Sequence, residues 1–237
     1  MLSRRGFLSL GPIAVGASLG SRAAGAEHET RRPRASTWGQ ANVPPSIAAL
    51  TSMKEKARPI TNDERRARIE KARRLMAEQG MAALMLTGGT SLLYFSNIRW
   101  GLSERLFSMV VPAKGEPFYV LPAFEADRAQ EQIDLGPFGA GKADIRLWQE
   151  DESPYERIAQ GLKDRGVTTG RLGIEETVRF VFSDGVAKAA PSLVLVSATP
   201  VTAGCRAVKD AHEIELMRLA SEVTLGAYAA AFAAVKD

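Results

Sequence analysis

The 237-residue sequence contains few of the side chains that most often bind transition metals: one cysteine, Cys205, and two histidines, His28 and His212. A single cysteine cannot form an intramolecular disulfide, and it is typically a small buried apolar residue. Two histidines far apart in the sequence exclude a histidine-rich zinc cluster. We therefore expect no disulfide-stabilised fold and no metal site within these residues.

A strong bias in composition or charge is also missing. The sequence is 45% hydrophobic and 24% charged, which excludes collagenous, coiled-coil and wholly disordered chains and suffices for one domain with a sizeable core. The formal net charge of +4 includes Arg4, Arg5 and Arg22. These three lie in a segment that we predict is removed, and without them the charge falls to +1. Charge therefore does not indicate a nucleic-acid partner.

The first 26 residues have the three parts of a twin-arginine signal peptide. Arg4 and Arg5 precede a mildly apolar run, and a small-x-small end places the cleavage after Ala26. The apolar run is shorter than the roughly 20 residues of a bilayer-spanning helix. We therefore expect export to the periplasm or exterior, with no permanent membrane anchor. Residues 27–60 contain several prolines and no sustained apolar period, which predicts a flexible leader.

The folded part is predicted to begin at Thr61. Thr61 and Glu64 have the spacing of a capping box, and the helix that they open should end at Gly80. The apolar run 82–86 predicts a buried strand that ends in a double-glycine turn. This turn lacks the longer glycine spacing and the Lys-Ser/Thr pair of a phosphate-binding loop.

Two β-rich runs at 106–111 and 118–121, joined by a loop with proline and glycine, predict an antiparallel hairpin. The elements expected after the hairpin are a helix at 123–133, a strand at 145–148, a helix at 153–165, a strand at 172–174, a helix at 180–190 and a strand at 193–196. About six strands alternating with helices predict an α/β fold, a mixed sheet flanked by helices. The core residues expected on central strands are Leu84, Leu86, Val110, Val120, Ile174 and Leu195.

The last predicted helix changes character along its length. Asp210 and Glu213 form a second capping pair, and the first half has a polar face. From Leu225 to Val235 the only polar group is the hydroxyl of Tyr228. A helix that is apolar on every side requires protein around it. We expect this stretch to stand uncovered in the chain as written.

In their order and spacing, these elements resemble the N-terminal domain of the creatinase/prolidase/Xaa-Pro aminopeptidase family of pita-bread metallopeptidases. The matching stretches are Ala82–Thr87, Glu104-Arg105 before Val110–Pro112, Gly115–Pro117 with Pro122 and Glu125, Leu172–Glu175, and Arg206–Ala211 with Glu213, Ile214 and Met217. The resemblance covers about residues 61–237. It implies a ribonuclease H-like domain at 61–205, followed at 206–237 by the linker and first helix of a catalytic domain.

The same resemblance implies the chemistry of that catalytic domain. Two aspartates, one histidine and two glutamates would hold two divalent metals, Mn, Co or Zn, that activate a bridging water. Those ligands come after the linker helix in the family, and no carboxylate of this chain matches a ligand motif. We therefore assign no catalytic residue, metal ligand or cofactor to these residues. The chain is expected to be a truncated product, catalytically incompetent as given.

One loop of the domain is a candidate for contact with substrate. In relatives the loop that matches Asn97–Arg105 helps to wall the active site, often that of the dimer mate. Trp100 would offer a flat apolar wall and Arg105 a fork for a carboxylate. The alternative is that Trp100 packs into its own domain and Arg105 pairs with a neighbouring acid.

The leading hypothesis is the N-terminal, substrate-gating and homodimer-forming domain of an exported Xaa-Pro aminopeptidase or dipeptidase that acts on proline-containing peptides. One alternative is a stand-alone, non-enzymatic binding module, which would require a polar surface on the last helix. The other is a family member that acts on a small osmolyte, as a creatinase-like hydrolase or a lyase.

Overall fold

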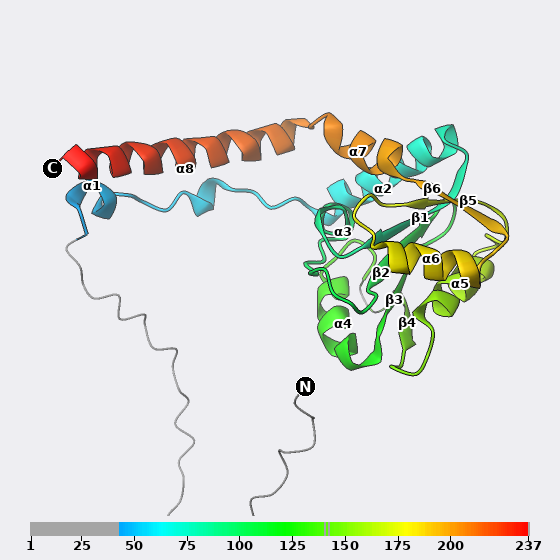
Figure 1. Ribbon diagram of the computed structural model, residues 1–237. Helices are drawn as coiled ribbons and strands as arrows, with labels where there is room; N and C mark the ends of the chain where they lie inside the picture. Colours follow the sequence, from blue (N-terminus) through cyan, green and yellow to red (C-terminus); the bar gives the residue numbers. More distant parts are fainter. Residues whose placement is uncertain (1–42, 140, 142, 237) are drawn as a thin grey trace, which may run out of the picture.

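The structure is a computed structural model that describes residues 43–236 except 140 and 142 (Figure 1). Arg4, Arg5, the predicted cleavage after Ala26 and His28 lie outside the described residues, as do residues 27–42 of the predicted leader. The signal peptide therefore stays a prediction. None of the helices in the described part of the chain combines the length and apolarity needed to cross a membrane.

A six-stranded mixed sheet forms the centre of the domain, in the order β4-β3-β2-β1-β5-β6. The strands are β1 (Met81–Thr87), β2 (Ser108–Pro112), β3 (Phe118–Pro122), β4 (Asp144–Trp148), β5 (Gly170–Ile174) and β6 (Leu193–Ser197). The pairs β1–β2 and β2–β3 are antiparallel, whereas β1–β5, β3–β4 and β5–β6 are parallel. The predicted mixed sheet and its one hairpin are confirmed.

Helices cover both faces of this sheet (Figure 1). They are α2 (Asn62–Glu78), α3 (Thr90–Ser96), α4 (Ala126–Asp134, preceded by the 3₁₀ helix η2, Ala123–Glu125), α5 (Pro154–Asp164), α6 (Phe180–Ala189) and α7 (Thr199–Ala207). One core cluster joins the sheet to α2, α3, α4 and α7, and the other joins it to α5 and α6. In β1, Leu84 and Leu86 contribute to the first cluster, whereas Ala83 and Met85 contribute to the second. Because both faces are covered, β1 is a nearly continuous apolar run.

Four of the six predicted core residues are fully buried, namely Leu84, Leu86, Val110 and Val120. Ile174 and Leu195 are only half-buried. Ile174 is the last residue of β5, and the prediction of a central strand for Leu195 is wrong because β6 forms one edge of the sheet. The sequence analysis also missed α7, which follows β6 directly.

The helix α2 begins and ends as predicted. The backbone N–H of Thr61 donates to Oε2 of Glu64 at 2.6 Å, and the N–H of Glu64 donates to Oγ1 of Thr61 at 3.2 Å. This reciprocal pair is the predicted capping box. Gly80 follows the helix with a φ of 62°, the left-handed conformation that glycine adopts without strain.

The last helix, α8 (Ala211–Lys236), extends away from the domain. Residues 43–60, which include α1 (Pro45–Ala48) and the 3₁₀ helix η1 (Lys54–Lys56), run back alongside it (Figure 1). Large apolar side chains of α8 are exposed as predicted, including Tyr228 at 61% and Phe232 at 67%. Ala230, at 8% exposure, is buried where α1 contacts α8.

Candidate functional site

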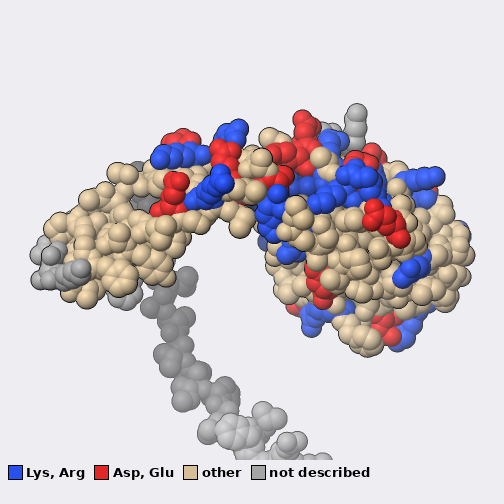
Figure 2. Space-filling model, turned by 90° about the horizontal axis from the view of Figure 1, so that it is seen from above, with Lys and Arg blue, Asp and Glu red and all other residues tan. Residues whose placement is uncertain are grey.

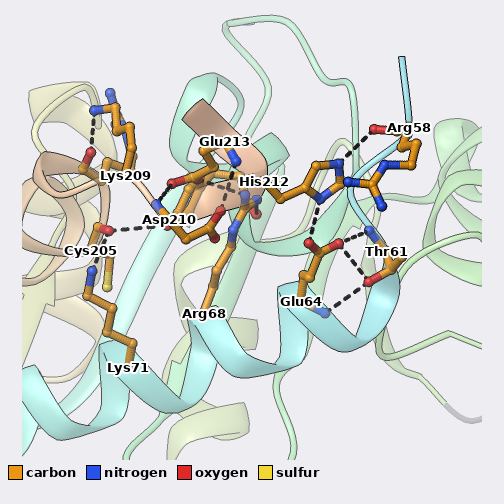
Figure 3. A network of polar contacts seen from close by, with 12 residues as sticks. Arg58, Thr61, Glu64, Arg68, Lys71, Cys205, Lys209, Asp210, His212 and Glu213 are labelled. Atoms are coloured by element: carbon orange, nitrogen blue, oxygen red, sulfur yellow. Dashed lines mark hydrogen bonds and ion pairs between the residues drawn. The ribbon is translucent and has the colours of Figure 1, made fainter. Parts of the chain in front are cut away.

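The junction between the domain and α8 contains a dense polar network (Figure 3). Asp210 precedes α8, and its Oδ1 accepts from the backbone N–H of Glu213 at 2.8 Å. In return, Oε2 of Glu213 accepts from the N–H of Asp210 at 3.0 Å. The second predicted capping box is therefore confirmed, and it orients the carboxylate of Glu213 at the first turn of α8.

The other oxygen of Glu213 forms an ion pair with Arg68 of α2, at 2.8 Å between Oε1 and Nη2. These side chains are only 9% and 14% exposed. Arg68 also donates to the carbonyl oxygen of Tyr94 in α3 at 3.0 Å, and its guanidinium lies 4.0 Å from the centroid of the Tyr94 ring. One buried cation thus joins α2, α3 and α8.

The end of α7 is held at the same place. The carbonyl oxygen of Cys205 accepts from Nζ of Lys71 at 2.8 Å and from the hydroxyl of Tyr94 at 3.2 Å. A cation at the carboxyl end of a helix is favourable because the helix dipole is negative there. Burial raises the pKa of Tyr94 to about 12, so its hydroxyl keeps its proton and can donate. Burial also raises the pKa of the Cys205 thiol, as expected of a buried, unreactive cysteine.

His212 lies between three segments of the chain (Figure 3). Its Nδ1 is 2.6 Å from Oε1 of Glu64 in α2, and its Nε2 is 3.0 Å from the carbonyl oxygen of Arg58. The guanidinium of Arg58 forms an ion pair with Glu215 of α8. Sequence analysis did not predict these contacts, since they join residues more than 140 positions apart in the chain.

The predicted substrate-contact residue Trp100 packs into its own domain. Its side chain is 7% exposed and stacks on Phe107, with ring centroids 4.4 Å apart. The guanidinium of Arg128 lies 4.3 Å from the Trp100 ring centroid. This is the packing that the sequence analysis left open as the alternative, and a role for Trp100 in lining a substrate site stays a prediction.

Arg105 lies at the surface and pairs with two carboxylates. It contacts Glu104, and its Nε donates to Oε1 of Glu150 at 2.7 Å. Its side chain is 38% exposed, and its guanidinium is 5.2 Å from the Phe124 ring centroid. The guanidinium is thus paired and still reachable from solvent, and its contact with a substrate carboxylate stays a prediction.

Exposed apolar side chains near this loop were not predicted. Leu102 within the loop is 65% exposed, Phe124 is 64% exposed and Phe180 is 82% exposed. The loop is tied to the helix α6 because Arg179, next to Phe180, donates to the carbonyl oxygen of Ser103 at 3.0 Å. Phe124 and Phe180 come shortly after the carboxyl ends of β3 and β5, the sheet edge where α/β domains place their sites. Their positions shortly after two strands were the sequence signal that could have marked Phe124 and Phe180 as candidate site residues.

A buried carboxylate at the same sheet edge is hydrogen-bonded to neighbouring residues of the domain. Glu175, 4% exposed, accepts from the hydroxyl of Ser91 at 3.0 Å and from both the N–H and the hydroxyl of Thr177, at 2.9 and 2.6 Å. Arg206 donates to Oγ of Ser91 at 3.2 Å. These bonds connect the start of α3, the end of β5 and the end of α7.

The described residues do not fit a two-metal site, because no three histidine, cysteine, aspartate or glutamate side chains among them converge. The junction and the surface loop therefore offer two capabilities. The first is rigid attachment of α8, and the second is contact with a partner or ligand through exposed apolar side chains and a paired arginine.

Comparison with known proteins identifies the family. Residues 68–208 match the Creatinase/Prolidase N-terminal domain. An uncharacterized peptidase of Schizosaccharomyces pombe is 30% identical over 198 residues, which are 77% of this chain and 41% of that protein. The probable dipeptidase PepE of Mycobacterium tuberculosis is 31% identical over 144 residues, which are 61% of this chain and 36% of that protein.

A solved structure gives the same result. The dipeptidase PepE of Mycobacterium ulcerans aligns with a TM-score of 0.59 at 26% identity, over 67% of this chain and 40% of that chain. The chain thus spans about two fifths of the length of the relatives that it matches. Because the family match covers more than half of its residues, this chain belongs to the creatinase/prolidase N-terminal domain family.

Proposed function

We propose that this chain is the N-terminal, substrate-gating and homodimer-forming domain of an exported metallopeptidase that hydrolyses dipeptides or Xaa-Pro peptides. The observation that carries the proposal is the state of α8. The Arg68–Glu213 ion pair joins the first turn of α8 to the folded domain, whereas the second half of α8 is apolar and exposed. Figure 2 shows the end of α8 that lies away from the domain almost without charged side chains. Such a surface suits packing against further protein.

The names of the relatives support the enzyme class. Two of them are described as a peptidase and a probable dipeptidase. In this proposal, two divalent metals (Mn, Co or Zn) supply the hydrolytic chemistry from a catalytic domain. No step is assigned to residues described here, since they offer no set of metal ligands.

The gating role rests on the loop at 97–105. Trp100 holds the loop to the domain by stacking on Phe107. Leu102 in the loop is exposed, and so is Phe124, which lies beside Arg105. Arg105 would bind a substrate carboxylate in place of the exposed Glu104, since a guanidinium matches a carboxylate in a two-point contact. The apolar neighbours would contact the substrate side chain.

The chain as written is expected to bind no divalent metal tightly and to hydrolyse no Xaa-Pro peptide. The physical reason is that two-metal hydrolysis needs several converging carboxylates and an imidazole. The assay would follow a Xaa-Pro dipeptide with added Mn²⁺, Co²⁺ or Zn²⁺, with calorimetry of metal binding in parallel. Turnover that a chelator abolishes would mean that a complete site exists within this chain.

A chimera tests the gating role directly. Residues 61–237 of this chain would replace the matching N-terminal part of M. tuberculosis PepE. We expect metal-dependent dipeptide hydrolysis, and Arg105→Ala should raise KM about tenfold or more with little change in kcat, because the lost contact is made equally in the ground state and the transition state. The matched control is Arg157→Ala, which removes another exposed pair, with Glu152. A folded, active chimera whose KM is the same in both variants would contradict the gating role.

Export is the remaining part of the proposal. Replacing both Arg4 and Arg5 with lysine should leave the full-length precursor in the cytoplasm, since the twin-arginine route reads the arginine pair. Cell fractionation and N-terminal sequencing measure the result. A single Arg22→Lys change serves as the control. Undiminished export of a product that starts near Glu27 in the paired variant would refute this route.

A further inference from the structure

We propose that residues 43–60 form a strap along α8 that protonated His212 fastens, and that the strap loosens when His212 loses its proton. This inference concerns the described residues alone and does not depend on the proposed function.

The strap touches α8 at both of its ends. Near its start, Oγ of Ser46 donates to the carbonyl oxygen of Ala230 at 2.9 Å, which is where α8 has its buried position. Near its end, Arg58 forms an ion pair with Glu215, and its carbonyl oxygen contacts Nε2 of His212 at 3.0 Å. Figure 1 shows the two segments side by side between these points.

The partners of His212 require both ring nitrogens to donate. The carbonyl oxygen of Arg58 can only accept, so Nε2 must carry a proton. The carboxylate of Glu64, 2.6 Å from Nδ1, also accepts in its ionised form. Only the imidazolium has a proton on each nitrogen, so the neutral ring must give up one of the two bonds. A hydrogen bond to a carboxylate is stronger than one to a neutral carbonyl, so the neutral ring keeps the bond to Glu64 and loses the bond to Arg58 in the strap.

The charges around His212 favour this imidazolium. Glu64 faces it from α2 with Arg68 one turn beyond, and Arg58 faces it from the strap. On α8 itself, Asp210, Glu213 and Glu215 flank it, with Glu213 neutralised by Arg68 and Glu215 by Arg58. The bond to Glu64 raises the pKa of His212. The bond from the Thr61 N–H, together with that from His212, lowers the pKa of Glu64 to about 2.

The direction of the pH effect follows from these shifts. His212 stabilises the strap at pH values below the ordinary histidine pKa of about 6.5, and this contribution disappears as the pH rises through the raised pKa. At the acidic end, the Glu64 contribution is lost as the pH falls from about 4.5 toward 2. The Arg58–Glu215 pair is 69% and 55% exposed, so alone it holds the strap weakly.

Amide hydrogen exchange of the full chain tests the proposal. The reporting amides are those of Ile47, Ala48, Ala49, Lys56 and Ala57, which are hydrogen-bonded within the strap. After correction for the intrinsic pH dependence of exchange, we expect the strap to exchange about fivefold faster at pH 8.5 than at pH 5.5, the factor that corresponds to one net hydrogen bond. Peptides from the middle of α2 should not change.

Three variants distinguish the proposed role of His212 from a general effect of pH on the chain. His212→Gln should loosen the strap at both pH values. Glu64→Gln keeps the capping box because the glutamine carbonyl oxygen accepts there. The glutamine NH2 then faces Nδ1 of His212, so a neutral ring can keep both of its bonds, and the strap should lose most of its pH dependence. The matched control, Glu70→Gln, removes a carboxylate elsewhere on α2 and should leave the pH dependence of the strap unchanged. Equal strap exchange at both pH values, or a pH dependence that survives in His212→Gln, would overturn the proposal.

Discussion

Leu86→Ala is expected to lower the free energy of unfolding of the domain by about 2 to 5 kcal/mol. Leu86 is fully buried in β1, which lies between β2 and β5 near the middle of the sheet. Its side chain packs in the cluster that joins the sheet to α2, α3, α4 and α7. The sheet and these helices hold one another in place, so they cannot collapse into the cavity that the shorter side chain would leave. The loss of unfolding free energy therefore includes the cost of the cavity as well as the lost apolar burial.

Urea unfolding followed by circular dichroism measures this loss. The matched control is Leu135→Ala, the same change at a position that is 69% exposed. The control should change the free energy of unfolding by less than about 0.5 kcal/mol. Losses of equal size in the two variants would mean that β1 does not occupy the centre of the core.

Arg68→Met is the second change with a large expected effect. It leaves Glu213 buried without its cation, and breaking a buried ion pair from one side costs about 3 to 5 kcal/mol. Glu213 stands at the start of a helix that extends away from the domain, so a less costly response is available. The first turn of α8 can lift off and return the carboxylate to water. We therefore expect release of α8 rather than unfolding of the sheet.

Hydrogen exchange of residues 211–220 measures this release, and urea unfolding reports on the domain. Lys188→Met is the control, since Lys188 pairs with Asp184 at an exposed position and should have almost no effect. Adding Glu213→Gln to Arg68→Met removes the orphaned charge but keeps the cap, so part of the attachment should return. If the double variant releases α8 as readily as Arg68→Met alone, desolvation of Glu213 is not the cause.

Local patterns predicted much of the fold. The two capping boxes, at Thr61 and Asp210, depend on residues three positions apart, and the β2–β3 hairpin depends on a short loop. Such interactions form within one stretch of chain, so the sequence alone is enough to recognise them. The apolar character of the second half of α8 was likewise read from one stretch of chain, and its side chains are exposed as expected.

The order of the strands was beyond this kind of reasoning. Pairing of β5 with β1 joins strands separated by the whole of β2, β3 and β4, and it leaves β6 at the edge. At this edge Leu195 is only half-buried, although its local pattern is that of a buried strand. The burial of Trp100 likewise depends on Phe107 and Arg128, which the fold brings to it.

The sequence by itself determined which segments become helices and strands, and which side chains cap them, because those preferences act between near neighbours in the chain. Only the tertiary structure decided the second partner of each capping carboxylate, His212 for Glu64 and Arg68 for Glu213. Capping occupies one oxygen of a carboxylate and leaves the other free. Which cation meets that free oxygen depends on how α2 and α8 pack, and segments so distant in the chain meet only when the whole domain has folded.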